Sequence, residues 1–112
     1  SILLAMMGSG FNGQNFAFNG YLPIDKAERK AKIKQLEKRS IQENQSQLFI
    51  ETPYRNNQML ESLTTTLQKN TEICVACDIT LSTEFITTAP AQHWKRIKVD
   101  LHKRPTLFII QG

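Results

Sequence analysis

A chain of 112 residues, of which 40% are hydrophobic and 21% are charged, falls in the range of one compact globular domain. Such a domain folds without a metal or a disulfide framework, and no run of the sequence approaches the ~18 consecutive apolar residues of a membrane-spanning helix. The formal net charge of +4 is concentrated in residues 25–39, so the rest of the chain sums to zero.

The apolar run over residues 2–7 is predicted to be the end of a helix. This apolar run lacks a basic flank and meets Gly8-Ser9-Gly10 instead of a cleavage pattern, so it is not typical of a signal peptide. A helix that begins at the first residue, without a capping residue, indicates a chain that starts within a larger protein. A strand is predicted next, over residues 16–22, where aromatic and small residues alternate before Pro23.

The segment after this strand predicts a basic surface helix. Asp25 and Glu28 have the spacing of a capping box, and the residues that follow favour a helix. Seven basic residues and three acidic ones lie between Asp25 and Arg39. A narrow apolar stripe should pack against the sheet; it consists of Ile33, Leu36 and Ile41. Two interpretations of the basic face stay open: it attracts phosphates or an acidic substrate, or it is an ordinary solvated face.

A loop is predicted over residues 42–46, followed by a strand over residues 47–51 that ends at Thr52-Pro53. The next element is a helix whose apolar residues recur at three- and four-residue intervals, as expected for packing against a sheet. These residues are Met59, Leu60, Leu63 and Leu67. The apolar run over residues 72–77 predicts a buried third strand.

The third strand contains both cysteines of the chain, Cys74 and Cys77. Residues three apart on a strand point to opposite faces, so the two thiols could not hold one metal ion together, and no second Cys or His pair completes a zinc set. Two cysteines are also too few for a disulfide framework. We interpret both as buried structural thiols of a protein from the reducing cytoplasm.

The last third of the chain predicts strands over residues 84–88 and 106–111, with a helix over residues 90–98 between them. A basic loop, Lys103-Arg104-Pro105, leads into the last strand. Helices between the first three strands suggest crossovers, while the short link to the fourth strand indicates a hairpin. The predicted fold class is therefore α/β, with a mixed sheet of about five strands flanked by helices.

Polar residues follow the apolar strands at the points where ligands of α/β proteins bind, outside the carboxyl ends of the strands. These segments are Leu22-Pro23, Glu51-Thr52-Pro53-Tyr54-Arg55 and Asp78-Ile79-Thr80. Solvated loops have the same polarity, so these residues alone indicate only a binding edge. His93 and His102 have no nucleophile or acidic partner at a recognisable spacing, and the sequence contains no glycine-rich phosphate loop or metal motif.

In their order and content, these segments resemble the C-terminal half of the tetrapyrrole (corrin/porphyrin) methylase family. The similarity covers essentially the whole chain and is carried by residues 9–11, 16–23, 48–55 and 76–80, together with the basic helix. It is strongest to the branch of bacterial small-subunit ribosomal RNA cytidine 2′-O-methyltransferases, whose Glu-Ser-Pro-His-Arg sequence corresponds to residues 51–55. The chain differs from that branch at Asn19, Cys77 and Asp78, where the branch typically has Glu, Arg and Glu.

The resemblance implies an S-adenosylmethionine-dependent methyltransferase whose cofactor lies in a cleft between two domains and which needs no metal. Residues 1–112 would form the C-terminal domain, and an N-terminal domain absent from this chain would complete the pocket, so the chain alone should be a poor catalyst. By analogy, the cofactor would contact the backbone at Thr52-Pro53, Ile79-Thr80 and Pro105-Thr106. Relatives are commonly homodimers. Exposed apolar surface would suit such an interface; it is expected at Phe11, Phe16, Ile97 and Leu101.

Methyl transfer is an in-line attack on a sulfonium methyl group, for which a protein mainly supplies alignment. A ribose 2′-hydroxyl would profit from a base, and Glu51 or Asp78 could serve, with Arg55 holding a phosphate or the carboxylate. Glu51 and Arg55 could instead form a structural pair. Ribosomal RNA is the expected substrate, because charged residues suit phosphates better than a flat macrocycle. Two alternatives stay open: a tetrapyrrole carbon as the methyl acceptor, and a non-catalytic basic module that binds nucleic acid.

Overall fold

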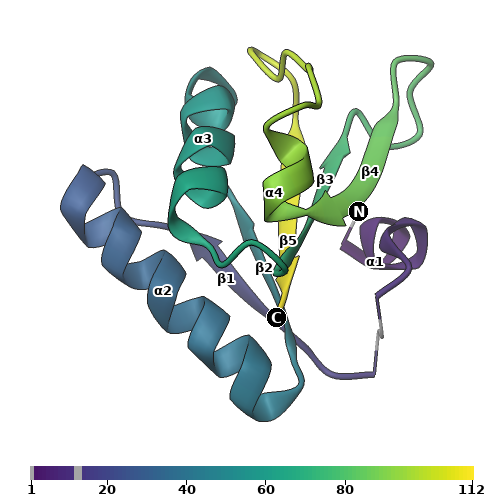
Figure 1. Cartoon of the computed structure of the whole chain (residues 1–112). Coiled ribbons are helices and arrows are strands. Elements are labelled where there is room, and N and C mark those ends of the chain that lie inside the picture. The colour runs from purple at the N-terminus through teal and green to yellow at the C-terminus, as the bar shows by residue number, and fades with distance from the viewer. Residues whose placement is uncertain (1, 12–13) are drawn as a thin grey trace.

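The computed structural model describes residues 2–11 and 14–112, in which helices cover both faces of a central sheet (Figure 1). The strands are β1 (Phe16–Tyr21), β2 (Ser46–Ile50), β3 (Glu72–Cys77), β4 (Phe85–Pro90) and β5 (Thr106–Gln111). The helices are α1 (Ile2–Ser9), α2 (Lys26–Glu43), α3 (Asn56–Thr66) and α4 (Ala91–Trp94), with a 3-10 turn, η1, over Pro53–Arg55. The strand order across the sheet is β1-β2-β5-β3-β4.

The sheet is mixed. β1 and β2 are parallel, and α2 connects them as the predicted crossover. β5 is antiparallel to both β2 and β3, so β2 and β3 point in the same direction with β5 between them. β3 and β4 form the predicted hairpin. β4 ends at Pro90, two residues beyond its predicted end, and a proline is tolerated there because β4 is an edge strand. The predicted α/β fold class with a five-stranded mixed sheet is confirmed.

Asp25 caps α2 as predicted. Its Oδ2 accepts a hydrogen bond from the Glu28 amide at 3.0 Å, which satisfies one of the amides that a helix start leaves unpaired. At the other end, Asn44 has a φ of 49° and forms a left-handed C-cap. The predicted loop over residues 42–46 is therefore wrong at both ends, because α2 takes its first two residues and β2 takes its last.

The buried face of α2 differs from the predicted stripe at one position. Ile33 and Leu36 are fully buried, as predicted, but Ile41 is 51% exposed. The neighbouring Ser40 is buried instead, and its hydroxyl accepts a hydrogen bond from the Gly112 amide at 2.9 Å. The hydrogen bond to Gly112 therefore explains why the buried residue at position 40 is polar.

The helix predicted between the last two strands is much shorter, because α4 ends at Trp94. Beyond it, the amides of Arg96 and Ile97 donate to carbonyls three residues earlier, at 3.0 and 3.1 Å, so the chain turns instead of continuing an α-helix. The Trp94 indole N–H donates to the carbonyl oxygens of Ile73 and Ala89, at 2.9 and 3.1 Å. These contacts with β3 and β4 anchor the short helix on the sheet.

Two apolar clusters lie on opposite faces of the sheet. The larger one lies under α2, α3 and α4 and includes Phe49 and Phe108, whose rings stack with centroids 5.9 Å apart. The smaller one lies under α1 and includes Leu48 and Ile109. Because side chains alternate along each strand, neighbouring residues of β2 and β5 enter different clusters.

The two cysteines lie on opposite faces of β3, as predicted. Cys77 belongs to the larger cluster and Cys74 to the smaller one. Both are free and buried, and burial raises the pKa of each thiol above its ordinary value. Neither thiol is therefore poised to act as a thiolate at neutral pH.

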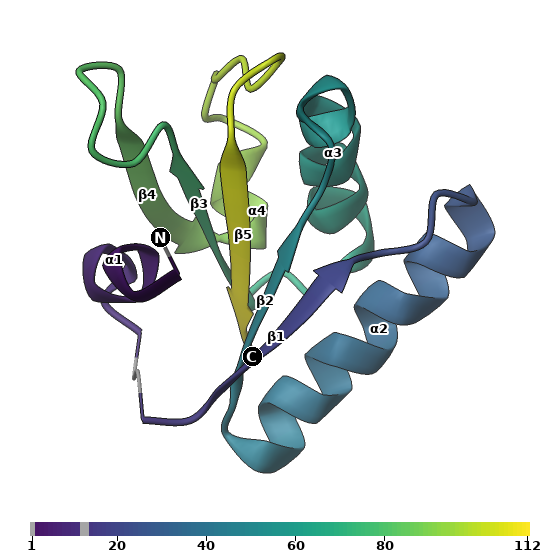
Figure 2. The same cartoon turned by 180° about the vertical axis from the view of Figure 1, so that it is seen from behind.

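α1 covers only part of its face of the sheet. It contacts β3, β4 and β5, and Figure 2 shows β1 and β2 with no helix in front of them. Phe18, on β1, is 47% exposed. This face of the sheet is therefore partly open between α1 and β1.

The exposed apolar side chains are not the predicted ones. Leu101 is fully buried, and Phe11, Phe16 and Ile97 pack against the two clusters, so the expected exposed surface at these four residues is wrong. Large apolar side chains that are exposed among the described residues are Leu4, Met7, Phe18, Tyr21, Ile24, Ile41, Tyr54 and Leu81. Within the same described ranges, no helix combines the length and the apolar character needed to cross a membrane.

Candidate functional site

Three loops meet at one edge of the sheet. β2 and β3 end at this edge and the antiparallel β5 begins there, which can be followed in Figure 1. The Lys103 amide donates to the Pro53 carbonyl at 3.1 Å, and the Asp78 amide donates to the Pro105 carbonyl at 3.0 Å. The tertiary structure thus brings together the three segments at which the resemblance implies contacts with a cofactor.

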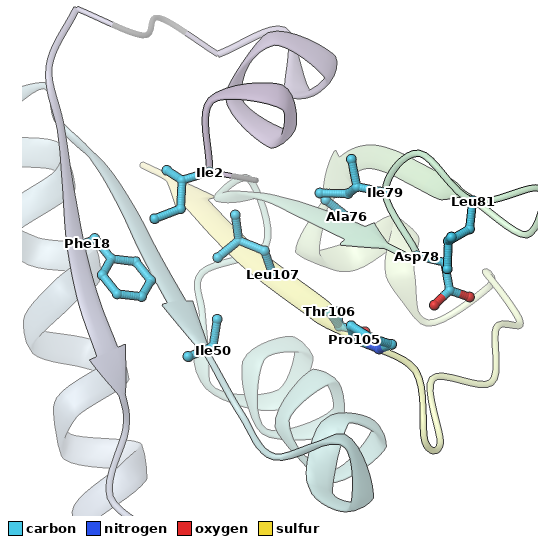
Figure 3. Close-up of a pocket in the computed structure, with 10 residues that line it drawn as sticks. All are labelled: Ile2, Phe18, Ile50, Ala76, Asp78, Ile79, Leu81, Pro105, Thr106 and Leu107. Atoms are coloured by element: carbon cyan, nitrogen blue, oxygen red, sulfur yellow. The ribbon is translucent and has the colours of Figure 1, made fainter.

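A groove of about 390 Å³ lies next to this edge, on the face of the sheet that carries α1 (Figure 3). Its volume falls in the range of pockets that bind small molecules. The lining residues are Ile2, Phe18, Ile50, Ala76, Asp78, Ile79, Leu81, Pro105, Thr106 and Leu107. The lining is therefore mainly apolar, and Asp78 is the charged residue among the lining residues named.

The predicted site residues fall into two neighbouring groups. Those that line the groove are Asp78, Ile79, Pro105 and Thr106. Those that do not line it are Glu51, Thr52, Pro53, Arg55 and Thr80. β2 contributes its last residue, Ile50, to the groove, and the chain then passes into η1. The segment after β2 therefore lies beside the groove and not within it.

Glu51 and Arg55 form an ion pair, in which Arg55 Nε lies 3.3 Å from Glu51 Oε1. The same oxygen accepts a hydrogen bond from the Thr52 amide at 2.7 Å. The Glu51 side chain is only 1% exposed, and its Oε2 has no hydrogen-bond partner among the described residues. A buried polar atom without a partner is costly, so Oε2 is an atom at which a hydrogen-bond donor would be favourable.

The backbone of Thr52 and Pro53 is already largely engaged. The Thr52 carbonyl accepts from the Arg55 amide at 2.9 Å, and the Pro53 carbonyl accepts from the Lys103 amide at 3.1 Å. The Thr52 amide donates to Glu51, and proline has no amide hydrogen. A cofactor contact at this pair would therefore have to use the second lone pair of a carbonyl oxygen.

The backbone after β3 is arranged differently. Asp78 and Thr80 have φ values of 50° and 72°, in the left-handed region that residues with a side chain rarely adopt. The Thr80 amide donates to Glu84 Oε1 at 2.9 Å. Ile79, between them, makes no backbone hydrogen bond within the described residues. Its amide and carbonyl therefore have no backbone partner there, and Ile79 itself lines the groove.

The carboxylate of Asp78 is held by two donors. Arg104 Nε donates to Asp78 Oδ2 at 2.8 Å, and the Thr83 hydroxyl donates to the same oxygen at 2.9 Å. The hydrogen bond from Arg104, more than any other interaction, lowers the pKa of the Asp78 carboxyl. A carboxylate with a lowered pKa is a weak general base. This geometry therefore does not favour Asp78 as the base of the reaction.

Sequence analysis did not single out Asn56, although it organises this edge. Its buried side-chain amide donates to the carbonyls of Leu101 and Arg104 and to Thr106 Oγ1, at 3.2, 2.7 and 3.2 Å. Asn56 thereby ties the start of α3 to the loop before β5. These partners lie 45 to 50 residues away in the sequence, so no local pattern indicated the contact.

No family model matches the chain, and no curated protein matches its sequence. Among solved structures, the methyltransferase CobJ is similar over 100% of this chain, with a TM-score of 0.61 and 15% identical residues. The fold is one that a methyltransferase uses. The chain spans 47% of the CobJ chain, about half of it. The similarity supports the tetrapyrrole methylase fold implied by the resemblance and gives no support to the ribosomal RNA branch.

Proposed function

We propose that this chain is one domain of an S-adenosylmethionine-dependent methyltransferase and that its groove holds part of the methyl donor. The proposal depends on the similarity of the whole chain to about half of the methyltransferase CobJ. The position of the groove supports it, because ligands of α/β proteins bind at the carboxyl ends of strands. Because this chain covers 47% of the CobJ chain, a second domain could complete the site, and by the resemblance we place it N-terminal to this one.

The residues of the groove fit such a donor. Ile50, Ile79 and Leu107 offer apolar surface to a flat base, and Asp78 offers an anionic acceptor to a hydroxyl or ammonium group. The free amide of Ile79 adds a backbone donor. When bound, S-adenosylmethionine supplies an electrophilic methyl group on a sulfonium centre. The chain's own residues would bind and orient the donor and keep water from the groove.

For the methyl acceptor we favour a ribose 2′-hydroxyl of ribosomal RNA. Glu51 lies at the same edge of the sheet as the groove and is the candidate base for the hydroxyl proton, but its unpartnered Oε2 is buried, so this role requires the side chain to become accessible when the substrate binds. Arg55, whose side chain is 33% exposed, could hold a phosphate. A tetrapyrrole carbon is the alternative acceptor, for which positioning alone would serve.

A methylation assay of the full-length protein with labelled S-adenosylmethionine tests both levels of the proposal. Ribosomal RNA from a strain that lacks the gene is offered beside uroporphyrinogen or a precorrin. We expect label in the RNA. Label in the tetrapyrrole and not in the RNA would contradict the proposed RNA acceptor and would still be consistent with a methyltransferase. A methyl donor that neither binds nor reacts would contradict the proposed methyltransferase activity.

α2 supports a second candidate function, the binding of nucleic acid without catalysis. Lys26, Lys30, Lys34 and Lys38 are all exposed and recur every four residues, so they lie along one side of the helix. Arg29 is buried and does not belong to this surface, in contrast to the predicted basic face. These four lysines are therefore the residues that phosphates would contact.

Binding of RNA through this face is expected to weaken steeply with salt, because released counterions drive it. For four phosphate contacts, raising the salt from about 50 to 200 mM should cost roughly a hundredfold in affinity. Fluorescence titrations of full-length protein with RNA measure this slope, and a Lys34→Gln/Lys38→Gln variant should reduce it. Binding that does not change with salt would exclude the electrostatic mode, while tight binding without any methyl transfer would favour this function over the enzyme.

We also propose that the whole protein is a cytoplasmic homodimer. Exposed Leu4, Met7 and Phe18, on and beside α1, support an additional covering domain or partner. The free, buried thiols of Cys74 and Cys77 are typical of a reducing compartment.

A further inference from the structure

The two oxygens of Asp78 have different surroundings. Oδ2 accepts hydrogen bonds from Arg104 Nε at 2.8 Å and from the Thr83 hydroxyl at 2.9 Å. Oδ1 makes no hydrogen bond within the described residues, while Asp78 lines the groove. Figure 3 shows this carboxylate on the loop after β3, at the end of the groove where Leu81 also lies. The protein therefore holds one oxygen, while the other makes none of the hydrogen bonds described.

Arg104 connects two loops around this carboxylate, the one between β3 and β4 and its own loop before β5. Besides the bond from Nε to Asp78, its two terminal nitrogens donate to the carbonyls of Asp100 and Thr83, each at 2.8 Å. The donors of a guanidinium lie in one plane and in fixed directions. With all three directions occupied, Arg104 has little freedom to turn, and the orientation of the Asp78 carboxylate follows from it.

The backbone at this point is also constrained. The φ of 50° at Asp78 places it in the left-handed region, which a residue with a side chain occupies only where its surroundings compensate. The Asp78 carbonyl accepts from the Leu81 amide at 2.9 Å, and the Asp78 amide donates to Pro105 at 3.0 Å. The strand end, the turn and the guanidinium together give the carboxylate one position relative to the groove.

We propose that Asp78 Oδ1 accepts a hydrogen bond from a hydroxyl or ammonium group of the bound methyl donor, and that Arg104 is the positioning residue that aims it. This inference rests on the proposed function, since it needs the donor to occupy the groove. The role suits the chemistry, because a carboxylate that stays ionised is a strong acceptor for such groups. It also assigns to Asp78 a part in binding instead of proton transfer.

Calorimetric titration of the full-length protein with S-adenosylmethionine tests the inference without measuring turnover. Asp78→Asn should weaken binding about five- to tenfold, because the acceptor loses its charge. Arg104→Met should weaken it to a similar extent, and Arg104→Lys should do so less, since it keeps a charge near Asp78. Lys103→Ala is the matched control, because its exposed side chain lies next to Arg104 in the sequence, and it should change the affinity less than twofold.

The double variant Asp78→Asn/Arg104→Met separates positioning from mere support of the fold. If Arg104 acts through Asp78, the double variant should bind no more weakly than Asp78→Asn alone, and additive losses would overturn the positioning role. Circular dichroism and the melting temperature identify variants that fail to fold. If Arg104→Met fails to fold, the double variant is made with Arg104→Lys instead.

Two fragments of the donor distinguish the group that Asp78 recognises. S-adenosylhomocysteine has both the ribose hydroxyls and the ammonium, whereas methylthioadenosine has only the hydroxyls. If Asp78→Asn weakens the binding of both ligands, Asp78 contacts the ribose hydroxyls. If it weakens only the binding of S-adenosylhomocysteine, Asp78 contacts the ammonium group. Wild-type affinity in Asp78→Asn for every ligand would overturn this inference but leave the proposed function intact. Absence of donor binding by the wild-type protein would overturn both.

Discussion

Replacing Phe108 with alanine is expected to lower the free energy of unfolding by about 3–5 kcal/mol, because the substitution removes a large buried ring and leaves a cavity. Phe108 is 0% exposed and lies on β5, which pairs with strands on both sides. Its ring stacks on Phe49 at 5.9 Å. Urea unfolding of the chain, followed by circular dichroism, measures the loss.

Phe18→Ala is the matched control for this prediction. Phe18 is also a strand phenylalanine, but it lies on the edge strand β1 and is 47% exposed. Its replacement should cost at most about 1–2 kcal/mol, because less apolar surface returns to water and solvent fills the space. Equal losses for the two variants would contradict the assignment of Phe108 to the main core.

Glu51→Gln is expected to lower the rate of methyl transfer to RNA by the full-length protein more than tenfold, which corresponds to about 1.4 kcal/mol in the barrier. This prediction depends on the proposed function and on Glu51 as the base. Glutamine has the same shape and can still accept from Arg55 and Thr52, which donate to Oε1. The substitution therefore removes the proton acceptor while the fold should change little. The measurement is kcat at saturating donor.

Glu72→Gln is the control for Glu51→Gln. Glu72 is exposed and begins β3, at the opposite edge of the sheet from the groove, so its replacement should leave kcat within twofold of wild type. An unchanged kcat in Glu51→Gln, with a folded protein, would assign Glu51 to a structural pair with Arg55. A tetrapyrrole acceptor would give the same result, and the choice of substrate in the labelling assay separates these two explanations.

The sequence by itself determined the elements whose signals are local. β3 and β5 have their predicted bounds, because each is a continuous apolar run with polar residues at its ends. The start of α2 was predictable from Asp25, since a capping side chain bonds an amide only three residues away. The opposite faces of Cys74 and Cys77 followed from the alternation of a strand. The polar strand ends also indicated the edge of the sheet beside which the groove lies.

Only the tertiary structure decided how these elements combine. No local pattern places β5 between β2 and β3, because strand pairing depends on contacts between distant segments. The same holds for the end of α4 at Trp94, whose hydrogen bonds to β3 and β4 join it to segments that no local pattern identifies. At the site, Glu51 and Asp78 have the same chemistry and the same place after a strand. In the structure Asp78 lines the groove, and its carboxylate accepts a hydrogen bond from Arg104, 26 residues away. Glu51 is buried next to the groove and does not line it.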